Sequence, residues 1–158
     1  MVIKTMGVFK ERVRPLSKVR NERIQDIFIS STDLSIVTFQ DCEFTNIVID
    51  NCSLQLVTFI DCVFRQSKIG NNEISETQFI NCVFSETEIL SNEFIKSKIM
   101  NSKFNFTHQE GNTYVETVLV GNIGLEHSQS SACLHEWVDI PGFTKIYVDC
   151  KKCGISQS

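Results

Sequence analysis

The feature that most constrains the fold is an apolar residue at every fifth position from Leu34 to Phe104, fifteen times without a miss. An amphipathic helix needs apolar residues about 3.6 positions apart and a half-buried strand needs them about 2 apart, so a period of five suits neither. The residue two places before each of them is uncharged and mostly small, whereas charges and amides crowd the other three places. The pattern therefore predicts a chain that turns at every repeat, with two inward and three outward residues on each side of a square coil.

A second period, of twenty residues, indicates how the turns stack. Three segments align at this spacing, Thr38–Phe44, Thr58–Phe64 and Gln78–Phe84, and Lys98–Phe104 continues the series weakly. Four repeats of five then make one coil, and we expect successive coils at the spacing of hydrogen-bonded strands, about 4.8 Å. The coils would hold one inward column of phenylalanine (Phe44, Phe64, Phe84 and Phe104) and one of cysteine (Cys42, Cys62 and Cys82).

Over about residues 32–106 the sequence resembles the pentapeptide-repeat family, whose consensus is a small residue, usually Ala, then Asp or Asn, then Leu or Phe, then two variable residues. The resemblance implies the fold of that family, an all-β, right-handed quadrilateral β-helix in which the Leu or Phe and the small residue point inward. The sequence departs from the consensus because it has no Ala at the small position and has bulky Ile47 in one of these slots. We expect a slightly swollen coil there rather than a different fold.

Thiols and amides at the small inward positions are interpreted as structural. A redox or metal stack is the alternative for Cys42, Cys62 and Cys82, but Cys is a compact buried side chain and no His adjoins these three. Asn72 and Asn92 share another column. A buried amide without partners costs about 1–3 kcal/mol, so we expect the two amides to hydrogen-bond to each other and to turn carbonyls.

Residues 1–23 are predicted to be a basic N-terminal arm or cap. The first twenty residues carry six Lys or Arg and one Glu, a net charge of +5, against −6 for residues 21–108 and −3 for residues 109–158. Such an arm could bind nucleic acid or an acidic partner, or it could fold over the first coil and cover its strand edges. Pro15 ends any helix that runs into it. We favour the cap because four residues give the arm an apolar surface, Phe9, Val13, Leu16 and Val19.

The period of five fails at Gln109, so the β-helix is predicted over residues 24–108. Residues 109–132 are predicted to hold a capping strand, Tyr114–Val120, followed by a serine-rich linker. The rest of the chain, residues 133–158, is expected to be a separate small module.

This C-terminal module contains a CxH motif and a CxxC motif separated by fourteen residues. Tetrahedral zinc takes four such ligands at about 2.0–2.3 Å, and a hairpin between the motifs would bring the two pairs together. The expected ligands of a structural Zn2+ are Cys133, His135, Cys150 and Cys153, in a zinc-binding hairpin that resembles a zinc knuckle or ribbon. Free structural thiols and a catalytic Cys–His pair are the alternatives, and the second is disfavoured because zinc would occupy all four side chains.

No constellation of residues in the sequence points to catalysis. His108 and His127 have no nearby nucleophile, and the sequence has no Gly-rich phosphate-binding loop. We therefore predict a non-enzymatic protein-interaction scaffold that binds a protein partner. Nucleic acid is not the expected partner, because the basic arm lacks interleaved aromatic residues and any recognised DNA-binding motif.

Two other functions are kept as alternatives. One is a component of a phage or other large assembly. The other comes from the family resemblance, since some pentapeptide-repeat proteins mimic duplex DNA, bind bacterial type II topoisomerases and cause quinolone resistance. The acidic pairs Asp41/Asp61 and Glu73/Glu93 fit mimicry, whereas the basic arm opposes it.

Apolar runs in the sequence are only a few residues long, against roughly 18 needed to span a membrane, so no membrane contact is expected. The N-terminal residues lack the apolar core of a secretory signal. Seven Cys without an export signal favour a reducing compartment. We expect a cytoplasmic protein, or a virion protein if a phage encodes it, and the sequence leaves its oligomeric state open.

Overall fold

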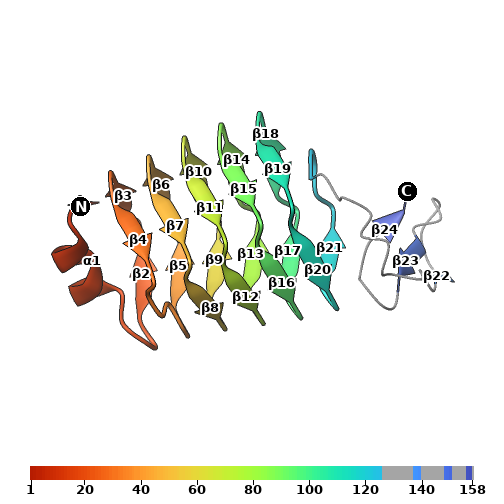
Figure 1. The fold of residues 1–158 in the computed structure, drawn as a ribbon, viewed down its shortest axis with the longest axis horizontal. Helices are drawn as coiled ribbons and strands as arrows, with labels where there is room; N and C mark the ends of the chain where they lie inside the picture. Colours follow the sequence, from red (N-terminus) through yellow and green to blue (C-terminus); the bar gives the residue numbers. More distant parts are fainter. Residues whose placement is uncertain (126–136, 140–147, 151–155, 158) are drawn as a thin grey trace.

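The computed structural model describes residues 1–125, 137–139, 148–150 and 156–157, and residues 18–123 form a right-handed β-helix (Figure 1). Each coil has four short sides. Equivalent sides of successive coils pair in parallel and make four sheets, which we call faces 1 to 4. The numbers follow the path of the chain around one coil, starting from the face that contains Arg23–Gln25.

The strands of the four faces are as follows. Face 1 contains β1 (Val2–Ile3), β3 (Arg23–Gln25), β6 (Glu43–Thr45), β10 (Val63–Arg65), β14 (Val83–Ser85) and β18 (Lys103–Asn105). Face 2 contains β4 (Phe28–Ser30), β7 (Val48–Asp50), β11 (Lys68–Gly70), β15 (Glu88–Leu90) and β19 (His108–Glu110). Face 3 contains β8 (Ser53–Gln55), β12 (Glu73–Ser75), β16 (Glu93–Ile95) and β20 (Thr113–Val115). Face 4 contains β2 (Lys18–Arg20), β5 (Thr38–Gln40), β9 (Thr58–Ile60), β13 (Gln78–Ile80), β17 (Lys98–Met100) and β21 (Val118–Val120).

The predicted register of twenty residues is confirmed on face 1. Phe64 pairs with Phe44 on one side and with Phe84 on the other, and Phe84 pairs with Phe104. Neighbouring rings in this column are stacked, with centroids 4.6, 4.9 and 4.7 Å apart. Such aromatic pairs contribute about 0.5–1.5 kcal/mol beyond the area they bury, so the column is a continuous spine of the core.

The chain turns at a corner residue with positive φ at every fifth position from Leu16 to Gly121, with φ between 47° and 69°. Asn and Asp tolerate this left-handed conformation better than other residues with a Cβ. Nine of the corners accordingly hold one of them: Asn21, Asp26, Asp41, Asn46, Asn51, Asp61, Asn71, Asn81 and Asn101. The requirement at the corners explains why amides and carboxylates recur with the same period as the apolar residues.

The inward amides pair as predicted. Asn72 Nδ2 donates to Asn92 Oδ1 at 3.0 Å and to the carbonyl of Ile49 at 3.0 Å. Asn112 continues the ladder, because Asn92 Nδ2 donates to its Oδ1 at 3.0 Å. Ser and Thr in equivalent slots also bond to the backbone of the preceding coil. Small polar side chains therefore connect one coil to the next inside the β-helix.

The β-helix continues beyond the boundary predicted at residue 108. Residues 109–123 form, in place of a capping strand, the remainder of one more coil, which includes β20, β21 and a bridge between Ile123 and Lys103. The predicted linker, at residues 128–131, lies outside the described residues. Gln109 keeps the register because its Nε2 donates to the Thr107 hydroxyl at 2.7 Å and to the carbonyl of Gly124 at 2.9 Å. Hydrogen bonds thus replace the apolar contact whose loss had suggested the end of the repeat.

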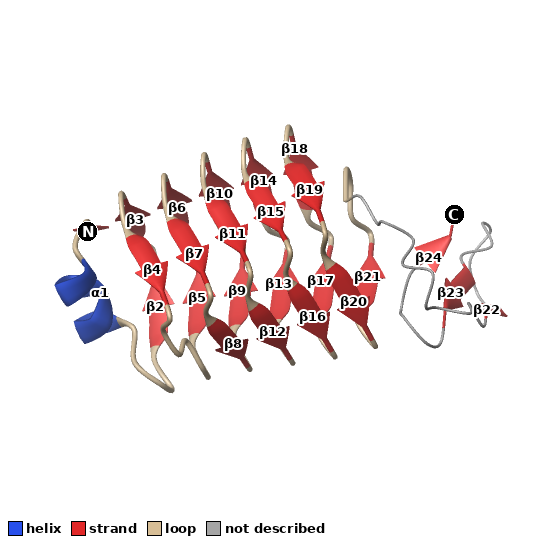
Figure 2. Cartoon of the chain, in the orientation of Figure 1, coloured by secondary structure: helices blue, strands red, loops and turns tan. Residues whose placement is uncertain are grey.

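At the other end, residues 1–17 cover the first coil, as the cap interpretation predicted, whereas residues 18–23, which were assigned to the arm, already belong to the β-helix. Helix α1 (Met6–Arg12) lies across the N-terminal end of the β-helix (Figure 2). Phe9 is only 1% exposed and belongs with Ile3 and Val13 to the buried core. Leu16 differs from the expectation, because it lies at a corner and is 78% exposed. In the described part of the chain, no helix has the length and apolar character needed to cross a bilayer.

Three short strands are described near the C-terminus: β22 (Trp137–Asp139), β23 (Val148–Cys150) and β24 (Ser156–Gln157). They form a three-stranded antiparallel sheet in which β23 is central. Pairing of β22 with β23 agrees with the strand arrangement predicted for this segment.

Replacing Phe64 by Asp should destabilise the protein far more than replacing Glu86 by Ala. Phe64 is fully buried in the aromatic column, so the variant loses the ring and buries a carboxyl group, which should cost at least about 3–5 kcal/mol. Glu86 is exposed at a corner and only accepts a hydrogen bond from Gln66, so the expected cost is about 1 kcal/mol. Urea denaturation measures both, and equal midpoints would contradict the assigned phase of the repeat.

The cap can be tested with two neighbouring residues of α1. Phe9→Ala should lower the free energy of unfolding by about 3–5 kcal/mol, because it empties a buried site over the first coil. Val8→Ala is the matched control, since Val8 is 36% exposed and its loss should cost less than about 1 kcal/mol. Thermal unfolding gives the difference. A Phe9→Ala protein that melts like the Val8→Ala protein would show that α1 does not stabilise the first coil.

Candidate interaction surfaces

The outward residues form columns along the axis of the β-helix, with one residue from each coil. The two acidic pairs singled out in the sequence are both neighbours in this arrangement. Glu73 lies directly opposite Glu93 on face 3, and Asp41 and Asp61 occupy the same corner of successive coils. Both pairs are exposed, and like charges placed opposite each other destabilise a sheet. The Glu73/Glu93 pair therefore contributes to the surface and not to the stability of the fold, whereas Asp61 also accepts a hydrogen bond from Asn81 Nδ2 at 3.2 Å.

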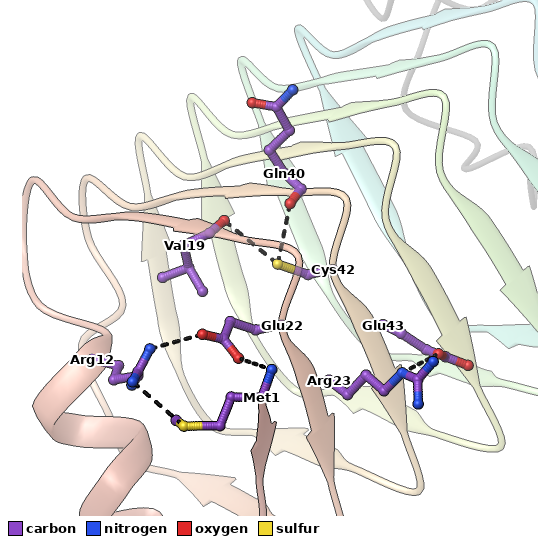
Figure 3. A network of polar contacts seen from close by, with 8 residues as sticks. All are labelled: Met1, Arg12, Val19, Glu22, Arg23, Gln40, Cys42 and Glu43. Atoms are coloured by element: carbon purple, nitrogen blue, oxygen red, sulfur yellow. Dashed lines mark hydrogen bonds and ion pairs between the residues drawn. The ribbon is translucent and has the colours of Figure 1, made fainter.

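A buried carboxylate joins the cap to the first coil (Figure 3). Glu22 occupies an inward slot and is 9% exposed, and Arg12 Nη1 donates to its Oε1 at 2.8 Å. The nitrogen of Met1 lies 3.4 Å from the other oxygen, Oε2, as an ion pair without hydrogen-bond geometry. A buried charge is tolerated only when it is paired, so Arg12 of α1 and Glu22 depend on each other. The sequence signal for this contact is an acidic residue at an inward position close to a basic arm.

Next to this pair lies a hollow of about 300 Å3 between the cap and face 4, lined by Arg12, Lys18, Val19, Arg20 and Glu22. Lys18 and Arg20 point outward from β2 and are exposed. Their partners in the sheet are the uncharged Thr38 and Gln40, and neither cation forms an ion pair within the described residues. The hollow is therefore a positively charged recess whose two outer cations are available to a ligand.

The corner beside this recess is apolar. Leu16, Ile36 and Leu56 occupy it in three successive coils and are 78%, 43% and 45% exposed. Their φ values are 69°, 57° and 57°, a conformation unfavourable for bulky side chains and rare for a β-branched one such as Ile36. The same corner holds Glu76 and Lys96 in the next two coils, so the apolar stretch is confined to the N-terminal half. We call these three residues the corner ridge.

The cysteines of the β-helix are structural. Cys42, Cys52, Cys62 and Cys82 are all buried and free, and the Sγ of Cys62 lies 3.3 Å from the carbonyl oxygen of Ile60. The side chain of Cys62 and burial raise the pKa of Cys42, and burial raises the pKa of Cys52. A protonated buried thiol is neither a nucleophile nor a metal ligand. Within the described residues no group of three or more His, Cys, Asp or Glu is placed to hold a metal.

The four predicted zinc ligands are not tested by this arrangement. Cys133, His135 and Cys153 lie outside the described residues. Cys150 is the last residue of β23, where its backbone pairs with that of Trp137. Zinc binding by these four residues stays a prediction.

No protein-family model and no curated protein matches the sequence. Solved structures do match the fold. A trypsin-treated variant of QnrB1, a plasmid-mediated fluoroquinolone resistance protein, aligns with a TM-score of 0.55 and 14% identity over 70% of this chain and 67% of its own. A pentapeptide repeat protein, Rfr23 from the cyanobacterium Cyanothece 51142, aligns with a TM-score of 0.52 and 8% identity over 67% of this chain and 86% of its own. The chain has the pentapeptide-repeat fold.

Low sequence identity is compatible with the pentapeptide-repeat fold, because the fold requires an apolar residue and a small residue at fixed places of each repeat and not particular amino acids. In this chain most of the small inward positions hold Cys, Ser, Thr or Asn in place of the Ala of the consensus, and Val37, Ile47 and Val57 fill three others. Thr77, for example, accepts a hydrogen bond from the backbone of Val57 and donates one to the carbonyl of Leu54. A slot that Ala fills by size is here filled by a side chain that also bonds to the preceding coil.

Thiol labelling should separate the two groups of cysteines. In the native protein Cys42, Cys52, Cys62 and Cys82 should resist iodoacetamide at pH 8, because all four are buried and out of contact with the reagent. All seven cysteines of the chain should react in urea. Mass spectrometry of tryptic peptides measures the labelling at each site. Native labelling of Cys62 as fast as in urea would contradict its buried position.

Proposed function

We propose that this protein is a non-enzymatic scaffold that binds another protein through the outward columns of its β-helix. The proposal rests on the observation that inward and outward residues of each repeat have different roles. Inward side chains pack together or bond to the neighbouring coil, whereas the outward ones form four regular faces. Such a surface can recognise a partner by repeated contacts at the strand spacing of about 4.8 Å.

The test is affinity purification of the tagged full-length chain followed by mass spectrometry. A partner should co-elute in a defined stoichiometry, and nuclease treatment should not release it. A Phe64→Asp protein, which disrupts the β-helix, is the control for binding to unfolded chain. The proposal fails if no protein co-elutes with the native chain above the level seen with this control.

Binding of a type II topoisomerase is a second candidate, favoured by the fold similarity to a fluoroquinolone resistance protein and by the exposed Glu73/Glu93 pair. The charged cap argues against it, since a DNA mimic would present one sign of charge. Purified gyrase should bind the chain, and Glu73→Gln with Glu93→Gln should weaken binding while the matched change Glu86→Gln should not. Absence of binding to gyrase would exclude this candidate and leave the general scaffold in place.

A role in a phage or other large assembly is the remaining candidate, and it would place the protein in a virion instead of the cytoplasm. Size-exclusion chromatography of the native complex from its source distinguishes the two. A particle of megadalton size that contains the chain would favour assembly. A complex with one or two proteins would favour a cytoplasmic scaffold.

The C-terminal module is proposed to bind about one Zn2+ per chain through Cys133, His135, Cys150 and Cys153. Metal analysis after purification without chelator should find it, and Cys150→Ser should abolish it without changing the melting of the β-helix. Cys52→Ser is the control, since that thiol is buried in the β-helix and should leave the zinc content unchanged. Protein that contains no zinc and whose Cys133, Cys150 and Cys153 all alkylate freely would contradict the proposal.

A further inference from the structure

We propose that the N-terminal half of face 4, with the corner ridge beside it, is the docking site for an acidic amphipathic helix of the partner protein. The inference rests on the proposed scaffold function and adds to it the face that is used and the kind of segment that binds. Two independent features of the surface meet at this place: the positively charged recess and the corner ridge.

The recess selects a negatively charged segment. Lys18 and Arg20 lie on the same strand with Val19 between them, so both point outward and line the recess. Arg14 is exposed nearby in sequence and, like them, forms no ion pair within residues 1–125. Arg12 closes the recess from the cap side, where Glu22 neutralises it. Three cations that form no ion pair with any described residue therefore remain to attract carboxylates.

The corner ridge requires that the ligand be apolar as well. Asn or Asp would suit a left-handed corner better than Leu or Ile, and would avoid exposing apolar surface. In Leu16, Ile36 and Leu56 this chain has the less favourable choice in three consecutive coils at the corner that borders the recess, whereas Phe106 is a single apolar residue at another corner. A partner that covers the ridge would recover the free energy of burying these side chains.

The spacing of the ridge favours a helix over an extended strand. Leu16 and Ile36 are neighbours, since the Leu16 amide donates to the Ile36 carbonyl at 2.8 Å, and equivalent residues of adjacent coils repeat every 4.8 Å or so. A helix that lies along the axis presents one residue per turn about every 5.4 Å, which stays within about 1 Å of the ridge over two turns. Residues on one face of an extended strand are about 6.6 Å apart, so a strand along the axis would be about 2 Å out of step with the ridge after a single coil.

Nucleic acid and lipid bilayers fit the two features less well. A phosphate backbone would use the cations but leave the corner ridge in water. In the described part of the chain the exposed phenylalanines are Phe28 on face 2 and Phe106 at the corner between faces 1 and 2, so neither lies beside the recess for bases to stack on. A bilayer would need the cations in one plane with the apolar residues, whereas Lys18 and Arg20 line a recess. An acidic amphipathic helix uses both features in one segment.

The probe is a fluorescein-labelled peptide of about 18 residues with Leu at alternating spacings of three and four and Glu on the flanking positions. Fluorescence anisotropy with the full-length chain should show saturable binding that weakens as salt rises. Lys18→Glu with Arg20→Glu should weaken binding at least about tenfold. Ile36→Asn should weaken it at least about fivefold while the melting temperature stays the same or rises, because Asn suits the corner.

Matched controls lie on other faces. Lys68→Glu with Lys103→Glu makes the same change in charge on faces 2 and 1, and Gln66→Asn introduces Asn at a corner of φ 47° diagonally opposite the ridge. Neither should change peptide binding by more than about twofold. A Lys-for-Glu version of the peptide should not bind.

The inference is overturned if the peptide shows no saturable binding, or if the face 4 variants bind it as well as the control variants do. It is also overturned if a 20-base-pair DNA duplex or phosphatidylserine vesicles bind more tightly and displace the peptide. The docking site can be wrong while the scaffold proposal holds, and one experiment separates the two outcomes. A co-purified partner that the Lys18→Glu, Arg20→Glu chain still retains would leave the scaffold standing with its site on another face.

Discussion

Hydrogen bonding between successive coils, in a register of twenty residues, is the constraint on which the rest of the structure depends. The amide of Val63 donates to the carbonyl of Cys42 at 3.0 Å, and equivalent bonds recur around every coil. Because side chains alternate between the two sides of a strand, a slip of one residue would turn the phenylalanine column to solvent and the charges to the inside. The same register stacks the rings inside and aligns the outward residues that a partner can contact.

The two ends of the β-helix meet this constraint in different ways. The N-terminal coils have mainly apolar side chains in their inward slots, as Ile27 and Ile47 show, and α1 covers them with Phe9. Towards the C-terminus the same column continues as Ser67 and Thr87, which bond to the preceding coil. The apolar end is the one that carries the cap, since its exposed edge could otherwise recruit other strands. The ion pair between Arg12 and Glu22 then places basic residues of the cap next to face 4.

Much of this architecture could be predicted from residue classes alone. The periods of five and twenty indicate the coil, its columns and the pairing of Asn72 with Asn92, all of which the structure contains. The end of the β-helix could not be predicted, because Gln109 breaks the apolar period and is retained through hydrogen bonds to groups fifteen residues or less away. Leu16 was assigned to the apolar surface with which the arm would cover the first coil. It lies instead at a corner, where the path of the backbone directs its side chain to solvent although the side chain is apolar.

What the sequence by itself determined is which residues face inward, since burial of one apolar residue in five leaves a single geometry that satisfies both the backbone and the core. What only the tertiary structure decided is which of the outward columns lies beside the cap. Lys18 and Arg20 are close in sequence, but Leu16, Ile36 and Leu56 meet only because coils stack in register. The recess forms only because α1 packs on the first coil. Both depend on contacts between distant segments, and the local pattern of five carries no information about them.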